Sequence, residues 1–214
     1  MALIKSALEL ALERTKDLEV DEVAIEANRI RMEGRRMAGK FLDDPEGCSL
    51  TDAVAGIDAS NRELYRKSLF DVLCTQIQLP GAYFDAGKLT SIGAGLGALA
   101  GAAPAKGRNT GAAAEKQVAA MMQQVSAFLT KYQEEVKRVE QAIRSQWAPK
   151  LKEKERQMAA RMGQEIRLDP MADPEFAAFY KKNVEGLKAS YGDALEQAKL
   201  EIAAICGFIE ETKK

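Results

Sequence analysis

The 214-residue sequence contains no histidine. Histidine is the commonest general base in enzymes, the commonest nitrogen ligand of metals and a usual partner of nucleophilic cysteine. The carboxylates are numerous but scattered, and no ExxH pair is present to build a di-iron site inside a helical bundle. We therefore expect a protein that is not an enzyme and that has no catalytic, cofactor-binding or metal-binding residues.

Cysteine is also scarce: Cys48, Cys74 and Cys206 are far apart and form no CxxC pair. An odd number of widely spaced cysteines is typical of reduced thiols rather than of a disulfide framework or a zinc site. Glu9 and Glu13 interrupt the apolar N-terminus, so it does not resemble a secretory signal. These features predict a cytoplasmic protein.

Aromatic residues make up only 6% of the chain, and the β-branched runs typical of strands are missing. Alanine, leucine, glutamate, lysine and glutamine, which favour helices, are abundant. The 31 basic and 32 acidic residues leave a net charge of −1, so no overall field attracts nucleic acid. The sequence predicts an all-α fold, and nucleic acid is not an expected partner.

Residues 1–80 carry the signals of an N-terminal helical unit. Apolar spacing together with start and stop signals places helical segments at residues 2–16, 21–41, 50–54 and 60–79. Ser60 and Glu63 have the spacing of a capping box, which predicts that the last of these helices begins there. Small residues such as Gly34 lie on the apolar stripe of the second segment, so a partner helix can approach it closely.

Glycine is concentrated in residues 81–111, which hold eight of the 16 glycines. Such a composition is typical of a linker, and we predict a Gly/Ala-rich linker here. Within it, Gly93, Gly97 and Gly101 form a GxxxGxxxG series that would let a helix pack closely. A close-packed helix and a membrane-inserting segment over 89–104 are the alternatives, although this uncharged run is shorter than the roughly 20 residues that span a bilayer.

Residues 112–214 carry the strongest periodic signal. From Val118 to Ile143, apolar residues recur at alternating spacings of four and three over three heptads. The series then shifts register near Pro149, where we expect a kink. A second apolar stripe runs over 174–211.

The two stripes predict a long antiparallel helical hairpin, coiled-coil-like, that packs with the N-terminal unit or extends from it. A short proline-containing turn between two long helices makes them antiparallel neighbours. Residues 112–168 carry 11 basic and 7 acidic residues, whereas 169–214 carry 6 basic and 9 acidic residues. Apolar burial would supply the stability of the hairpin, and the opposite charges would help to fix its pairing.

Two groups of residues are candidates for interaction. Arg29, Arg36 and Lys40 lie near one another on the second predicted helix and could bind an anionic partner. Glutamates one turn away would pair with them, so a solvated charged face is the competing interpretation. Gly93, Gly97 and Gly101 form the second group because their series would expose a flat ridge of backbone.

The architecture favours a non-catalytic structural or protein-interaction protein, a scaffold or adaptor, that self-associates. A two-helix hairpin has apolar stripes that either the N-terminal helices or a second copy must cover. Protein partners and a homo-oligomer are therefore expected. Two alternatives stay open: a membrane-active protein that uses the segment 89–104, and a ligand-binding or enzymatic helical bundle.

Overall fold

The computed structural model is helical, without strands, over the part of the chain that it describes: residues 22–81, 83–103, 111–165 and 167–208. The helices in this part are α2 (Glu22–Asp43), α3 (Leu50–Ala55), α4 (Ala59–Thr75), α5 (Ala86–Gly101), α6 (Gly111–Met162), the 3-10 helix η1 (Pro170–Ala172) and α7 (Pro174–Ile205). The predicted all-α class is confirmed. The helix predicted over 2–16 lies outside the described residues.

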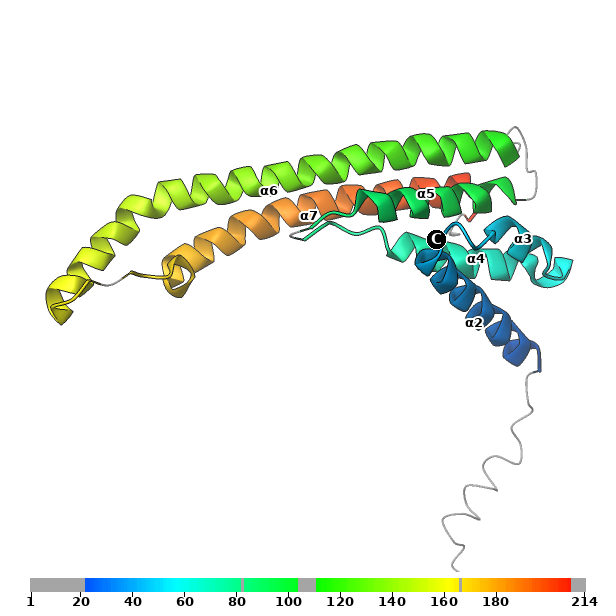
Figure 1. Ribbon diagram of the computed structural model, residues 1–214, viewed down its shortest axis with the longest axis horizontal. Coiled ribbons are helices and arrows are strands. Elements are labelled where there is room, and N and C mark those ends of the chain that lie inside the picture. The colour runs from blue at the N-terminus through cyan, green and yellow to red at the C-terminus, as the bar shows by residue number, and fades with distance from the viewer. Residues whose placement is uncertain (1–21, 82, 104–110, 166, 209–214) are drawn as a thin grey trace, which may run out of the picture.

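Helices α6 and α7 form the predicted long antiparallel hairpin (Figure 1). They contain 52 and 32 residues, which correspond to lengths of about 78 Å and about 48 Å. The carboxylate of Asp173 caps α7 by accepting the main-chain N–H groups of Glu175 and Phe176. Helix α6 continues through Pro149, and Figure 1 shows it bending toward its C-terminal end.

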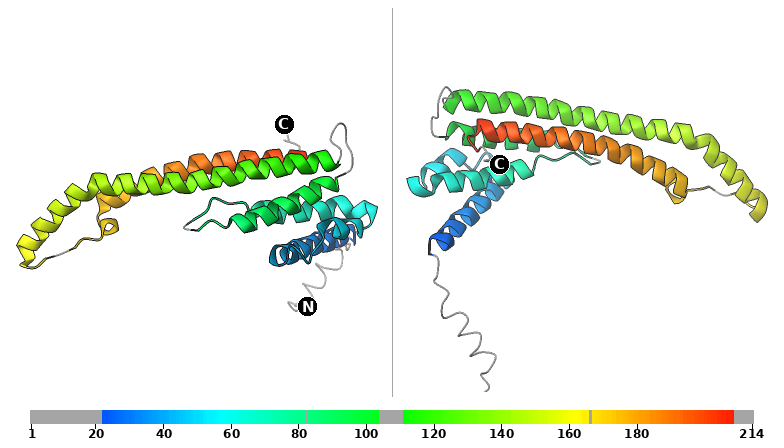
Figure 2. Two further views of the ribbon diagram at one scale, coloured as in Figure 1. Left: turned by 45° about the horizontal axis from the view of Figure 1, so that its top comes forward. Right: turned by 180° about the vertical axis from the view of Figure 1, so that it is seen from behind.

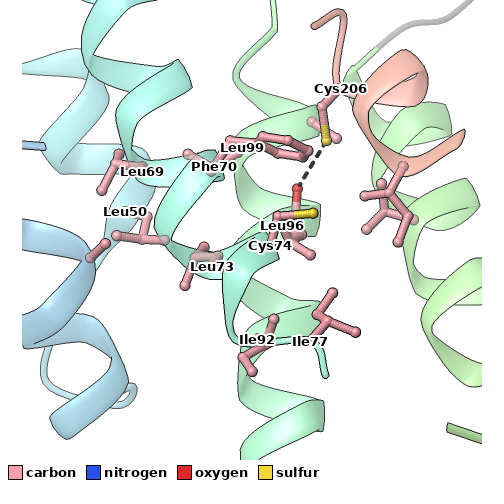
Figure 3. Close-up of a cluster of buried hydrophobic side chains, with 14 of the residues drawn as sticks. Leu50, Leu69, Phe70, Leu73, Cys74, Ile77, Ile92, Leu96, Leu99 and Cys206 are labelled. Carbon is pink, nitrogen blue, oxygen red and sulfur yellow. Dashed lines mark hydrogen bonds between the residues drawn. The ribbon is translucent and has the colours of Figure 1, made fainter. Parts of the chain in front are cut away.

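The main core joins the N-terminal helices to one half of the hairpin. Helices α4 and α5 lie against the hairpin, and α2 and α3 pack on their far side (Figures 1 and 2). Helix α6 contributes the first part of its predicted stripe, with Val118 and Leu129 almost fully buried. Figure 3 shows Leu69 of α4 on the side of Leu50 of α3 in this core, and Leu96 of α5 on the side of Cys206. The N-terminal helices therefore cover the hairpin over this half.

Residues 86–101 form a buried helix and not the predicted linker, so the close-packed alternative describes them. Asp85 caps this helix by accepting the main-chain N–H of Lys88 at 2.9 Å. A Cβ on Gly95 would lie 2.7 Å from the Phe41 ring and 3.0 Å from Leu73. Only small residues let α5 fit between α6 on one side and α2 and α4 on the other, which explains why this helix is rich in glycine.

The predicted capping box of Ser60 and Glu63 is wrong. Helix α4 begins at Ala59, with Asp58 as the preceding residue, so Ser60 already lies inside its first turn. Glu63 instead accepts hydrogen bonds from the guanidinium of Arg66 at 2.9 to 3.2 Å. The Glu63 carboxylate, which a capping box would use, is therefore paired with the charged guanidinium of Arg66 one turn away.

Candidate interaction surfaces

Beyond the main core, the hairpin continues as a two-helix arm with a small core of its own (Figure 2). The buried residues of this second core are Ile143, Trp147 and Leu151 from α6 and Phe176 from α7. The Trp147 and Phe176 rings meet edge to face, with their centroids 5.7 Å apart, a favourable arrangement for aromatic pairs. The arm thus covers its apolar stripe with large aromatic side chains, without a third helix.

Polar contacts also join the two helices of the arm. The Tyr180 hydroxyl donates a hydrogen bond to Glu140, and this carboxylate raises the pKa of the tyrosine. The Lys154 ammonium donates to Asp173, the residue that caps α7. That contact, together with the main-chain N–H of Phe176, lowers the pKa of the Asp173 carboxyl. The far end of the arm is therefore fixed by a charged cap as well as by aromatic packing.

The free end of the arm exposes three methionines. Met158 and Met162 lie one turn apart on α6, and Met171 lies in η1; their exposed fractions are 39%, 60% and 52%. We call Met158, Met162 and Met171 the methionine tip. A hollow of about 340 Å³ lies beside it, lined by Lys154, Gln157, Met158, Arg161, Leu168, Ala172, Asp173 and Pro174. Methionine side chains adapt to varied apolar partners, so this end of the arm is suited to binding.

The predicted arginine group lies on the exposed side of α2. Arg29 forms ion pairs with Glu26 at 2.7 Å and with Glu33 at 3.6 Å. The hydrogen bond from Arg29 lowers the pKa of Glu26. Arg36 and Lys40 are exposed as well. Arg29 is therefore part of an ion-paired surface, and a role of Arg36 and Lys40 in binding stays a prediction.

The glycine series of α5 faces α6. A Cβ on Gly93 would lie 3.3 Å from Met122, and one on Gly97 would lie 3.4 Å from Glu115. Gly101 has more room, with 3.7 Å from its added Cβ to the Glu115 carboxylate. A shallow groove of about 360 Å³ lies beside this contact. The series thus serves a contact within the protein.

None of the described helices is both long enough and apolar enough to cross a membrane.

Arg66 is a buried residue that the sequence did not reveal. Its guanidinium, 1% exposed, donates to the main-chain oxygens of Leu99 at 3.0 Å and Cys206 at 2.8 Å. It also pairs with Glu63 and lies over the Phe208 ring at 4.2 Å. One side chain of α4 therefore holds the C-terminal ends of α5 and α7. Because arginine is almost always exposed, nothing in the local pattern distinguished Arg66 from its neighbours.

Two of the three cysteines lie in the main core. Burial raises the pKa of the Cys74 thiol to about 11 and that of the Cys206 thiol to about 12. Figure 3 shows the Cys206 sulfur directed at the main-chain oxygen of Leu96, 3.8 Å away. Cys48 is only partly buried. All three are free thiols, and the two core thiols are held in their unreactive form.

Taken together, the fold and its surfaces define a helical bundle with a projecting two-helix arm. The pattern of a family of unknown function, DUF6657, matches residues 51–204, which include most of α3 and nearly all of α7. The chain belongs to this family. Helix α2 lies outside the matched residues. No curated protein and no solved structure matches the chain.

Proposed function

We propose that this protein is a non-catalytic interaction protein, a scaffold or adaptor, that self-associates and uses the arm as its docking element. The observation that carries the proposal is the arm itself, which projects from the bundle and ends in the methionine tip. Leu129 is the last α6 residue in the main core, and Met162 lies 33 residues further along the same helix. That separation amounts to about 50 Å, so the tip is well clear of the bundle.

The contents of the bundle interior favour this proposal over an enzymatic bundle. The main core consists of aliphatic and aromatic side chains packed against one another. Its one buried charged group among the described residues, Arg66, has its donors directed at two main-chain oxygens and Glu63. A guanidinium committed in this way holds helices together and is not presented to a ligand.

The packing of α5 favours the proposal over a membrane-active protein. Leu96 and Leu99 are fully buried in the main core. Inserting residues 89–104 into lipid would expose Phe41 of α2 and Leu73 of α4, against which α5 packs. An Ala/Gly-rich segment would gain little from the bilayer. The free cysteines are consistent with a cytoplasmic setting for such a scaffold.

Light scattering coupled to size-exclusion chromatography tests the self-association. We expect the weight-average mass of the full chain to rise above that of the 23.4 kDa monomer as concentration increases. A constant monomer mass at high concentration would remove self-association from the proposal. A second measurement compares the proteins captured from native cells by the full chain and by its Met162→Glu variant. Docking through the arm requires that the variant loses partners that the unmodified chain retains.

A further inference from the structure

We propose that the methionine tip of one copy binds the N-terminal segment, residues 1–21, of a second copy. This inference rests on the proposed self-association and names the two surfaces that would meet. The core of the arm leaves apolar side chains of the tip uncovered: Met162 and Met171 are each more than half exposed. Met158 and Met162 lie one turn apart on α6, and exposed apolar groups that adjoin one another mark binding surfaces more often than scattered ones do.

The charged groups around the tip indicate the charge of its partner. Glu155 and Asp169 each accept a main-chain N–H of the turn between α6 and α7, at 3.0 Å. Arg156, Arg161 and Arg167 are close to these carboxylates in sequence but have no ion pair with any residue that the structure describes. Glu155 and Asp169 therefore stabilise the backbone of this turn, and the remaining exposed charges beside it are the three guanidinium groups and the Glu165 carboxylate. An amphipathic partner with acidic residues would match both features.

The segment 1–21 has this chemistry. Its sequence places Ile4, Leu8 and Leu12 at helical spacing. It contains five acidic residues (Glu9, Glu13, Asp17, Glu19 and Asp21) and three basic ones (Lys5, Arg14 and Lys16), a net charge of −2. The apolar stripe would cover the methionines, and the carboxylates would face the free guanidinium groups.

The geometry requires that this contact forms between two copies. If residues 2–16 form the helix that their sequence predicts, this helix and five extended residues would reach about 40 Å from Glu22. The methionine tip lies about 50 Å beyond the main core along α6. Figure 1 shows the N-terminal end of α2 on the side of the bundle that points away from the arm. With that helix formed, a segment attached at Glu22 would therefore fall short of the tip of its own chain.

A contact between two different surfaces gives the assembly a particular form. Each copy offers one segment and one tip, so two copies can exchange segments in a closed two-fold dimer, and contacts that do not close in this way produce larger rings or open chains. The exposed residues at the start of α2, Val23 at 80% and Ile25 at 59%, adjoin the docking segment. They would extend its apolar surface in the assembly.

Complementation between two full-length variants tests this inference. The first variant, Met158→Glu with Met162→Glu, disrupts the tip and leaves the segment intact. The second variant, Leu8→Glu with Leu12→Glu, disrupts the segment and leaves the tip intact. We expect each variant alone to be monomeric, with association weakened about tenfold or more, and a 1:1 mixture to form a dimer and nothing larger. Leu200→Glu, at a residue of α7 that is 51% exposed, is the matched control and should associate normally.

The possible results separate this inference from the proposed function. If the wild-type chain associates and the tip variant does so equally well, the tip is not the contact and only this inference fails. If each variant alone is monomeric and the 1:1 mixture also stays monomeric, the contact is not between tip and segment. A wild-type chain that is always monomeric contradicts this inference and the proposed self-association together. Unchanged circular dichroism and thermal unfolding of each variant show that the substitutions altered the surface and not the fold.

Discussion

Replacing Arg66 with alanine should destabilise the bundle far more than replacing a neighbouring arginine. The substitution removes a donor from two buried main-chain oxygens, those of Leu99 and Cys206, and each unsatisfied acceptor costs about 1–3 kcal/mol. It also leaves a cavity under Phe208, whose ring lies 4.2 Å from the guanidinium. We expect the free energy of unfolding to fall by about 3–5 kcal/mol, a large part of the 5–15 kcal/mol that is typical of a folded domain.

Arg62 provides the matched control for this measurement. It lies one turn earlier on the same helix and donates to the main-chain oxygen of Ile57 at 3.0 Å, but it is exposed to solvent. Arg62→Ala should therefore cost about 1 kcal/mol or less. Arg66→Met fills most of the cavity without restoring the hydrogen bonds. It should therefore lower the free energy of unfolding by less than Arg66→Ala does and by more than Arg62→Ala does.

Equilibrium unfolding in urea, followed by circular dichroism and by tryptophan fluorescence, measures these losses. The chain has a single tryptophan, Trp147, which lies in the core of the arm. Circular dichroism reports on all the helices, and the fluorescence of Trp147 reports on the arm. The reasoning is refuted if Arg66→Ala destabilises the protein no more than Arg62→Ala does.

The remaining predictions concern packing and thiol reactivity. Gly95→Ala should destabilise the protein by about 1–3 kcal/mol in urea unfolding, because its Cβ would overlap an aromatic ring. Gly39→Ala, with open space around the added Cβ, should instead stabilise it by about 0.5–1 kcal/mol. At pH 8, a thiol reagent should modify Cys48 at once in the native protein. Cys74 and Cys206, with pKa values of about 11 and about 12, should react only after unfolding or as the pH rises toward those values; rapid native modification of all three would contradict their burial.

The hairpin could be predicted from the sequence because its signal is long and regular. Val118 and Ile143, at the two ends of the predicted heptad series, are both buried. Trp147 and Leu151, which follow the predicted shift in register, are buried too and belong to the core of the arm. Over this length the periodicity is determined by helix geometry alone, so it did not depend on knowing the neighbouring helices.

Helix α5 could not be placed because its packing depends on residues that are small. Gly93 and Gly95 lie on opposite sides of the helix, one near Met122 of α6 and the other near Phe41 of α2. A helix enclosed on both sides has no polar face, so it has no amphipathic period. The same glycines were therefore compatible with a linker, a close-packed helix or a membrane-inserting segment, and only the helices packed on both sides distinguish these interpretations.

The methionine tip and Arg66 were missed for different reasons. Met158 and Met162 continue the apolar series of α6, a pattern that is typical of core residues. Helix α7 begins only at Pro174, and the turn before it leaves these methionines partly uncovered. Arg66 is buried because two helix ends converge on it from residues 33 and 140 positions away. Neither property can be read from local spacing, since each depends on where distant chain segments stop.

The arm can remain ordered with only two helices because both of its helices belong to the main core. A helix that starts alone must bear the unfavourable nucleation of its first turn. Helix α6 enters the arm already formed, since Val118 to Leu129 are packed in the bundle, and α7 leaves the arm to end at the Arg66 contact. The second core therefore needs to stabilise only the continuation of the two helices and the turn between them. Trp147 packs the helices together, and the Asp173 cap stabilises the start of α7. The bundle thus sets the direction of the arm, and the arm holds the methionine tip at a fixed place in solution.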